Sequence, residues 1–154
     1  MRRLPFPVCG GGKLGEKMDN YFDVALEPKE LGAISALGLA HIGDAVYELL
    51  VRSYLCCRGD VTVQQLHKDS VALVSAPAQA DFVEALLSHL TEEEMALYRR
   101  GRNSHPHGVP KSASPGEYAR ATGLEALFGG LFLAGRARRC NELFIIGMEA
   151  HHGL

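Results

Sequence analysis

The stretch LGLAHIGDAVYELLVRSYL, residues 37–55, constrains the fold of this chain more than any other. Its apolar residues recur at the spacing of an amphipathic helix, which predicts one long helix with a core-facing side made of Leu39, Ile42, Val46, Leu49 and Ser53. Asp44 and Glu48 fall on the other side, where apolar Val51 and Leu55 also lie, so we expect a partly enclosed seam that contains carboxylates. Such carboxylates are costly unless they are paired or bind a metal.

Gly43, directly before Asp44, indicates that this seam is a functional site. Glycine inside a helix costs about 1 kcal/mol relative to alanine, but its missing Cβ lets another backbone, a metal ion or a phosphate approach closely. A plainer interpretation is also open. Asp44 could be an ordinary surface carboxylate, and Glu48 with Arg52 has the spacing of an intrahelical ion pair.

The remaining sequence predicts an all-α protein with a single compact helical domain. A chain of 154 residues with 47% hydrophobic content can bury one core, and no segment alternates apolar and polar residues as a strand would. Helix-start signals are found at Ser75, in the box Thr91-x-x-Glu94 and in the box Ser114-x-x-Glu117. Six helices are predicted, at residues 37–55, 62–74, 75–90, 91–101, 115–134 and 137–150, with Gly101 ending the fourth.

The N-terminal segment, the lack of a long apolar stretch and the cysteines indicate how the domain is organised and where the protein acts. Residues 1–20 contain two prolines and the run CGGGKLG, which predicts a flexible arm before a helical domain at 21–154. No stretch approaches 18 apolar residues, so we expect no membrane segment and a cytoplasmic location. Four cysteines without C-x-x-C spacing, at positions 9, 56, 57 and 140, predict reduced thiols rather than a disulfide framework or a structural zinc site.

Charge is distributed unevenly along the chain. Residues 1–98 hold 8 Lys/Arg against 14 Asp/Glu, whereas residues 99–154 hold 8 against 4. The segment from Met95 to Gly116 contains no acid at all, and it concentrates Arg99, Arg100, Arg102 and Lys111 together with Asn103, Ser104 and two histidines. A basic loop of this kind is typical of phosphate-backbone binding. An ordinary solvated loop remains the alternative.

A second carboxylate is predicted to join Asp44. Glu125 is the only acid in the segment ARATGLEALFGGLFLAG, and Gly129 lies one turn beyond it on the same helix face. Because two helices notched by glycine can cross closely, we expect Asp44 and Glu125 to meet. Paired carboxylates suit Mg²⁺, which prefers oxygen ligands and is often completed by substrate phosphate. Metal-assisted attack of water on a phosphodiester is the chemistry that such a site could perform.

These residues resemble a known family. The segments HIGDAVYE, LHKDSVALVSAPAQA, TEEEMALYRRGRN, VPK and YARATGLEALFGGLFL are similar, in order and spacing, to Mini-III ribonuclease, the short bacterial relative of ribonuclease III. The classical ribonuclease III signature has a Glu one turn before Asp44 and an Asp one turn before Glu125. This chain has Ala40 and Thr122 there, as the short family does.

The resemblance implies a fold of the ribonuclease III catalytic-domain type and a homodimeric, Mg²⁺-dependent endonuclease of double-stranded RNA. Its implied role is maturation of the large-subunit (23S) ribosomal RNA precursor. Asp44 and Glu125 would be the catalytic metal ligands, and Tyr118 and Arg120 would join the basic loop in RNA binding. Double-stranded RNA is recognised mostly by shape and phosphates. The absence of Trp and the 7% aromatic content also argue against a single-strand binder, which needs stacking platforms.

Two other functions remain open from the sequence. A non-catalytic helical module could bind RNA or protein, in which case Asp44 would have a structural role. An all-α nucleotide pyrophosphatase could use Glu92, Glu93 and Glu94 as metal ligands. However, acids that follow a capping threonine are also favoured by the helix dipole alone.

Overall fold

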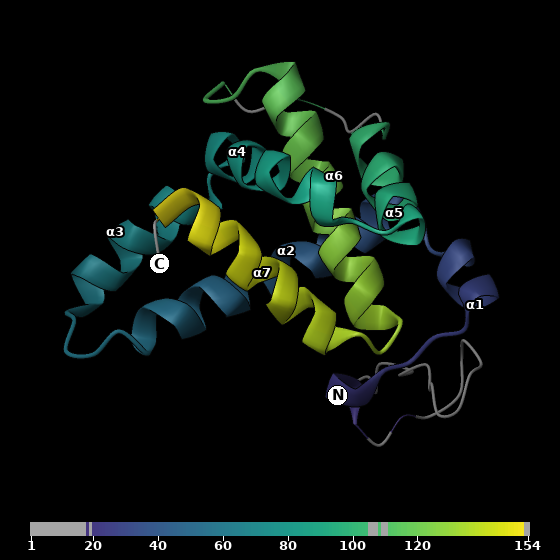
Figure 1. Cartoon of the computed structure of the whole chain (residues 1–154), viewed down its shortest axis with the longest axis horizontal. Coiled ribbons are helices and arrows are strands. Elements are labelled where there is room, and N and C mark those ends of the chain that lie inside the picture. The colour runs from purple at the N-terminus through teal and green to yellow at the C-terminus, as the bar shows by residue number, and fades with distance from the viewer. Residues whose placement is uncertain (1–17, 19, 105–107, 109–110, 153–154) are drawn as a thin grey trace, which may run out of the picture.

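The computed structural model describes residue 18, residues 20–104, residue 108 and residues 111–152. All regular secondary structure in these residues is helical, and none of them forms a strand, which confirms the all-α class (Figure 1). The described elements are η1 (Tyr21–Asp23), α1 (Pro28–Ala33), α2 (Ala36–Cys56), α3 (Val63–Val74), α4 (Ala76–Leu86), η2 (Leu87–His89), α5 (Glu92–Arg102), α6 (Pro115–Leu133) and α7 (Ala137–His152).

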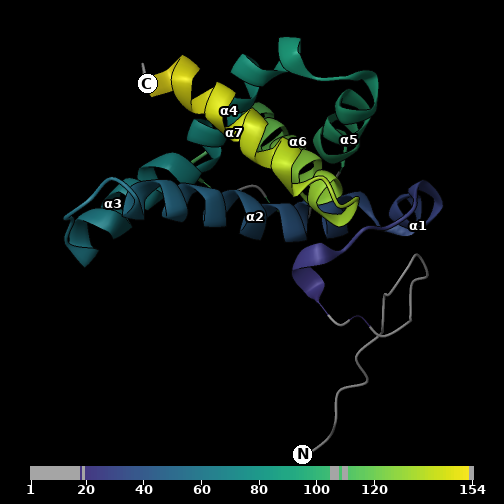
Figure 2. The same ribbon diagram turned by 60° about the horizontal axis from the view of Figure 1, so that its bottom comes forward.

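Helix α6 is the centre of the packing. It makes its most extensive contacts with α2, followed by α5 and α4, and α7 also lies against it (Figures 1 and 2). Every residue from Ala121 to Leu131 is buried except Glu125. A helix that is apolar on all sides must be covered on all sides, so the other helices are arranged around α6. Within this buried segment, the one residue that is not buried is the carboxylate Glu125.

The predicted helix starts are confirmed at atomic detail. The side chain of Ser75 accepts a hydrogen bond from the backbone N–H of Ala78 at the start of α4. Reciprocal capping boxes are present at Thr91 with Glu94 and at Ser114 with Glu117. These caps satisfy backbone donors that the first turn of a helix leaves unpaired.

The predicted end of the fourth helix was wrong, and one short helix was not predicted. Gly101 does not end α5, which continues to Arg102. Instead Gly101 is buried where α5 crosses α6, and an added Cβ would lie 2.5 Å from the carbonyl oxygen of Thr122. The short helix α1 was not predicted, although Pro28 at its first position and a capping box between Glu27 and Glu30 are signals that mark its start.

The predicted core-facing side of α2 was only partly right. Leu39 is fully buried, but Leu49 is 57% exposed. The buried residues are Leu39, Ala40, Gly43, Tyr47, Val51 and Leu55. The buried face of α2 is rotated about the helix axis relative to the predicted stripe. Small residues meet α6 at the crossing, and Tyr47 packs edge-to-face against Phe82 and Phe128 in the core. The seam expected beside Asp44 is therefore the edge of the core itself.

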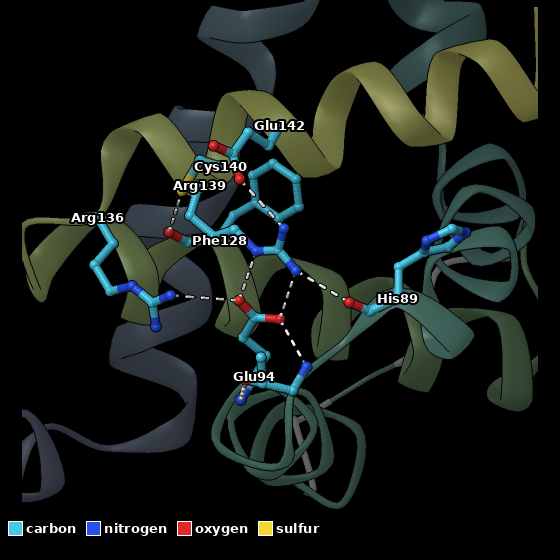
Figure 3. Close-up of polar contacts among 8 residues, drawn as sticks. His89, Glu94, Phe128, Arg136, Arg139, Cys140 and Glu142 are labelled. Carbon is cyan, nitrogen blue, oxygen red and sulfur yellow. Dashed lines mark hydrogen bonds and ion pairs between the residues drawn. The ribbon is translucent and has the colours of Figure 1, made fainter.

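Glu94 is a fully buried carboxylate that is satisfied by other residues (Figure 3). Its two oxygens accept hydrogen bonds from Arg139 at 2.7 and 3.2 Å, and one also accepts from the backbone N–H of Thr91 at 2.9 Å. Arg136 approaches to 3.8 Å. Burial alone would raise the pKa of Glu94, but the hydrogen bonds from Arg139 and Thr91 and the two guanidinium charges lower it below its usual range. Glu94 thus ties α5 to α7 and is not available as a metal ligand.

The described cysteines are free thiols, as predicted: Cys56 and Cys57 are exposed and Cys140 is buried. Burial raises the pKa of Cys140 to about 12, and its Sγ lies 3.5 Å from the carbonyl oxygen of Phe128. Most of the predicted arm at 1–20, Cys9 included, lies outside the described residues. Among those residues no single helix is long and apolar enough to cross a membrane, although the bent pair Val63–Val74 with Ala76–His89 passes by length and composition.

Candidate metal and RNA site

Two glycines let α2 and α6 cross with their backbones in contact. A Cβ added to Gly43 would overlap the carbonyl oxygen of Glu125 and lie 2.7 Å from the backbone nitrogen of Gly129. A Cβ added to Gly129 would overlap the carbonyl oxygen of Leu39 and lie 2.9 Å from the nitrogen of Gly43. The close crossing predicted from the sequence is therefore confirmed, and it places Asp44 of α2 beside Glu125 of α6.

Both carboxylates have raised pKa values, and the charge of Asp44 acts on Glu125. Glu125 is half-buried, and its pKa is raised to about 8 from the usual 4.5, first by burial and second by the charge of Asp44. Asp44 retains exposed surface, yet partial burial and the charge of Glu48 raise its pKa, while His41 one turn away opposes that rise. Two like charges held together near an apolar core favour a proton or a cation between them.

Within the described part of the chain, no basic side chain forms an ion pair with Glu125. The neighbour that lowers the pKa of Glu125 there is the uncharged side-chain amide of Gln79. Glu94 in the same protein shows the usual solution for a buried carboxylate, namely two arginines. Two adjacent carboxylates without a paired arginine among the described residues are a set of oxygen ligands that would suit a divalent metal ion.

Few further protein ligands are available to such an ion. Among the described residues no group of three or more His, Cys, Asp and Glu side chains is placed to hold a metal. The positions one turn before each carboxylate carry Ala40, which is buried, and Thr122, whose hydroxyl donates to the carbonyl of Tyr118 at 2.9 Å. Two carboxylates with several waters and a substrate phosphate suit Mg²⁺ better than a metal that needs a closed protein cage.

We expect Glu125→Gln to stabilise the metal-free protein increasingly as pH rises. Because the folded pKa is about 8 and the ordinary value is 4.5, only the unfolded chain releases this proton between those pH values. The wild type therefore loses stability through this window, whereas the amide variant does not. Urea unfolding in a metal chelator should show a gain on the order of 1–3 kcal/mol at pH 8 and almost none at pH 4.5. Glu149→Gln, on the exposed side of α7, is the control. An equal gain at both pH values would contradict the assignment.

The predicted RNA-binding residues lie at two levels of exposure. Arg99, Arg102, Asn103 and Lys111 are exposed, and Arg100, Tyr118 and Arg120 are half-buried. Arg100 donates to the carbonyl oxygen of Ile34 at 2.6 Å, so part of its guanidinium joins α5 to the chain between α1 and α2. His105 and His107, in the same loop, fall outside the described residues.

Arg102 and Arg120 belong to one group of side chains around Tyr98. The guanidinium of Arg102 lies over the Tyr98 ring, with 5.5 Å from its central carbon to the ring centroid. Arg120 pairs with Glu84 at 3.7 Å, and its buried Nε finds no hydrogen-bond partner among the residues that the structure describes. The charges of both arginines act on the phenol of Tyr98. The ends of α5 and α6 therefore bring basic residues together, although 17 positions separate Arg102 from the next arginine.

Sequence reasoning missed Gln79. This residue is 2% exposed and its side chain interacts with the carboxylate of Glu125. The available signal is a polar residue at the head of an otherwise apolar helical stripe that continues with Phe82, Val83 and Leu86. The sequence could reveal that Gln79 is unusual, but it could not reveal which group the amide contacts.

Comparison with known proteins gives a consistent result. The ribonuclease III domain family matches residues 37–136. A curated relative from Symbiobacterium thermophilum, named Mini-ribonuclease 3, is 51% identical over 107 residues, which cover 70% of this chain and 82% of the relative. A Mini-ribonuclease 3 from Gloeobacter violaceus is 42% identical over 127 residues, covering 82% of this chain and 93% of the relative.

Solved structures agree with the sequence matches. An X-ray structure of a Fusobacterium nucleatum protein superposes with a TM-score of 0.72 at 29% identity, covering 79% of this chain and 94% of that one. The helical fold and these relatives define an endoribonuclease of the ribonuclease III type. Within that class, the chain belongs to the Mini-ribonuclease 3 family.

Proposed function

We propose that this protein is a Mg²⁺-dependent endoribonuclease that cleaves double-stranded RNA and acts in the cytoplasm in maturation of the 23S ribosomal RNA precursor. Asp44 and Glu125 are the proposed metal ligands and catalytic residues. The observation that carries the proposal is the crossing of α2 and α6, which sets the carboxylates of Asp44 and Glu125 close enough for the charge of one to act on the other. Family membership supplies the reaction class.

The geometry supports hydrolysis by positioning and charge. When bound, Mg²⁺ would supply a Lewis acid and a means of activating water. The protein contributes the fixed separation of Asp44 and Glu125, which the glycine contacts set on two helices. It also contributes the apolar wall of α6, which limits water around Glu125 and so strengthens charge interactions there.

The decisive experiment is an assay of the purified protein on RNA duplex, on each separated strand and on DNA duplex of the same sequence. We expect cleavage of the RNA duplex alone, in the presence of Mg²⁺ and not in a chelator. A duplex built from the ends of a 23S precursor should be cut at discrete positions. Binding of RNA duplex without cleavage at any Mg²⁺ concentration would favour the non-catalytic module instead.

Seven residues are the proposed RNA contacts: Arg99, Arg100, Arg102, Asn103, Lys111, Tyr118 and Arg120. They come from α5, the following loop and the start of α6. Five of them, Arg99 to Lys111, lie in the stretch from Met95 to Gly116, which contains no acid. Phosphate contacts fix the position of a duplex and release counterions, so binding should weaken steeply with salt.

We expect the double variant Arg99→Ala/Lys111→Ala to flatten the dependence of log K on log salt. Each lost phosphate contact removes about 0.9 of a unit of slope, the B-DNA value. Both side chains are exposed, so folding should be unaffected and turnover at saturating RNA should change little. Arg138→Ala, an exposed arginine on α7, is the matched control. Unchanged slope in the double variant would mean that this loop is an ordinary solvated segment.

We also propose that the protein is a two-fold homodimer whose interface includes α2. Leu37 and Leu49 are 44% and 57% exposed on that helix, so the other residues that the structure describes leave part of its apolar surface uncovered. A two-fold axis would place one carboxylate pair over each strand of a duplex. We expect a dimer by sedimentation velocity at micromolar concentration and a monomer for Leu49→Glu. Val63→Glu, at an 81% exposed position on α3, is the control, and a monomeric wild type would overturn the proposal.

A further inference from the structure

We propose that Glu84 of α4 competes with RNA for Arg120 of α6: the Glu84 carboxylate is the counter-ion of this arginine in the free protein, and a phosphate of the RNA duplex displaces it. This inference rests on the proposed function, because Arg120 is one of the proposed RNA contacts. It adds α4 to the elements that decide how tightly RNA binds.

The ion pair between Glu84 and Arg120 is incomplete. The Oε1 atom of Glu84 lies 3.7 Å from the Nε atom of Arg120, which is close enough for charge attraction but too far for a hydrogen bond. The Nε atom is buried and finds no acceptor among the described residues. Because a buried donor without an acceptor is costly, Glu84 neutralises the charge of Arg120 without satisfying its hydrogen bonding.

The pair is open to solvent, so its partners can be exchanged. The side chains of Arg120 and Glu84 keep 36% and 54% of their surface exposed. Exposed ion pairs contribute little to stability, so the protein loses little when Arg120 changes its partner. A phosphate can accept two parallel hydrogen bonds from one guanidinium. An arginine that turns from Glu84 to a phosphate therefore gains the hydrogen bonds that it lacks in the free protein.

The charge around Tyr98 is unbalanced. The guanidinium of Arg102 lies over the Tyr98 ring, 5.5 Å from its centroid, and Arg120 and Glu84 also act on the phenol of this residue. Two positive charges against one negative charge leave a surplus at this place. Such a surplus attracts a phosphate backbone, and it becomes larger once Glu84 no longer pairs with Arg120.

Arg120 lies on a different side of α6 from the proposed metal ligands. Gly123, three residues further on and thus on the same helix face, packs against Tyr98 of α5, where an added Cβ would lie 2.5 Å from the ring. Gly129, on the face of Glu125, instead meets the backbone of α2. The ion pair can therefore change the affinity for RNA without a contact to the metal ligands.

Glu84→Gln tests the competition, because glutamine keeps the size of the side chain and removes its charge. Binding of an RNA duplex, measured in a metal chelator so that no strand is cut, should strengthen by about 2- to 5-fold. In an Arg120→Ala background the same substitution should have no effect, since no arginine is left to compete for. Asp81→Asn, at an exposed acid one turn earlier on α4, is the matched control and should leave the affinity unchanged.

The outcomes separate this inference from the proposed function. If the wild type neither binds nor cleaves RNA duplex, the proposed function fails and this inference fails with it. If the wild type cleaves RNA duplex but Glu84→Gln binds it no more tightly, only the competition is overturned. An equal gain with and without Arg120 also overturns the competition, because the effect is then one of net charge alone.

Nuclear magnetic resonance of the ¹⁵N-labelled wild type gives a test that does not depend on the folding of Arg120→Ala. The Nε–H resonance of Arg120 should shift when RNA duplex is added in chelator, because this donor changes its surroundings. The resonance of Arg139, whose Nε donates to Glu94 at 2.7 Å, is the internal reference and should not move. An Arg120 resonance that stays in place at saturating RNA overturns the inference.

Discussion

Asp44→Asn is expected to reduce Mg²⁺-dependent cleavage of double-stranded RNA by at least about 10³-fold, with folding and RNA affinity intact. Asparagine keeps the volume of the side chain and removes the charge that we propose holds the metal. Because a metal contributes several kcal/mol of transition-state stabilisation, a loss of about 4 kcal/mol corresponds to that factor. Initial rates on a long RNA duplex at saturating RNA measure it. Asp44 is exposed at the end of the seam, so the substitution opens no cavity.

A control on the same helix is available. Glu48 lies one turn from Asp44 and forms an ion pair with Arg52 at 2.7 Å, as the sequence predicted. Glu48→Gln removes an acid of the same region but not a proposed metal ligand, and cleavage should persist within a few-fold. Glu125→Gln should match Asp44→Asn, and the double variant should be little worse than either, since ligands of one metal act as a unit. Near wild-type cleavage by Asp44→Asn would remove Asp44 from the site.

The crossing of α2 and α6 could be predicted from the sequence because glycine inside a helix is a local signal with a specific physical consequence. Gly43 and Gly129 each weaken a free helix, and close backbone approach is the compensation that the structure shows. The same signal was misinterpreted at Gly101, where a basic and polar stretch follows and an end of the helix was the simpler prediction. There too the glycine marks a helix crossing.

Other parts of the fold depend on which residues meet across long sequence separations, and periodicity does not contain that information. The predicted apolar stripe of α2 included Leu49, but the core selected Tyr47 and Val51, because the aromatic cluster around Phe82, Phe128 and Phe144 needs a partner there. The stripe that remains exposed is the basis of the dimer proposal.

The roles of two carboxylates show the same limit. From the sequence, Glu94 and Glu125 could both be candidate metal ligands. Arg139, 45 residues away from Glu94, decides the outcome by forming a buried ion pair with it. Burial and the charge of Asp44 raise the pKa of Glu125 against the opposing effect of Gln79, whereas the pKa of Glu94 falls. The distinction lies in the tertiary partners, and neither carboxylate has a local sequence pattern that reveals them.

Gly43→Ala is the substitution expected to damage the structure most. The added methyl would overlap the carbonyl oxygen of Glu125 and lie 2.5 Å from its carbonyl carbon. Both atoms belong to the backbone of the central helix, so no flexible side chain can move aside. We expect a loss of about 3–5 kcal/mol in the free energy of unfolding, above the usual 1–3 kcal/mol for an overpacked core. For a chain of this size the melting temperature should fall by about 10 °C or more.

Helix propensity alone predicts the opposite sign, which makes the experiment discriminating. Alanine is favoured over glycine by about 1 kcal/mol in a helix interior, and an added Cβ at Gly32 of α1 or Gly116 of α6 would meet no atom within 4 Å. Gly32→Ala and Gly116→Ala should therefore leave the protein equally or slightly more stable. Gly129→Ala should resemble Gly43→Ala, since its methyl would overlap the carbonyl oxygen of Leu39. If Gly43→Ala unfolds at or above the wild-type temperature, the two helices do not cross as described, and Asp44 and Glu125 are not held together by this contact.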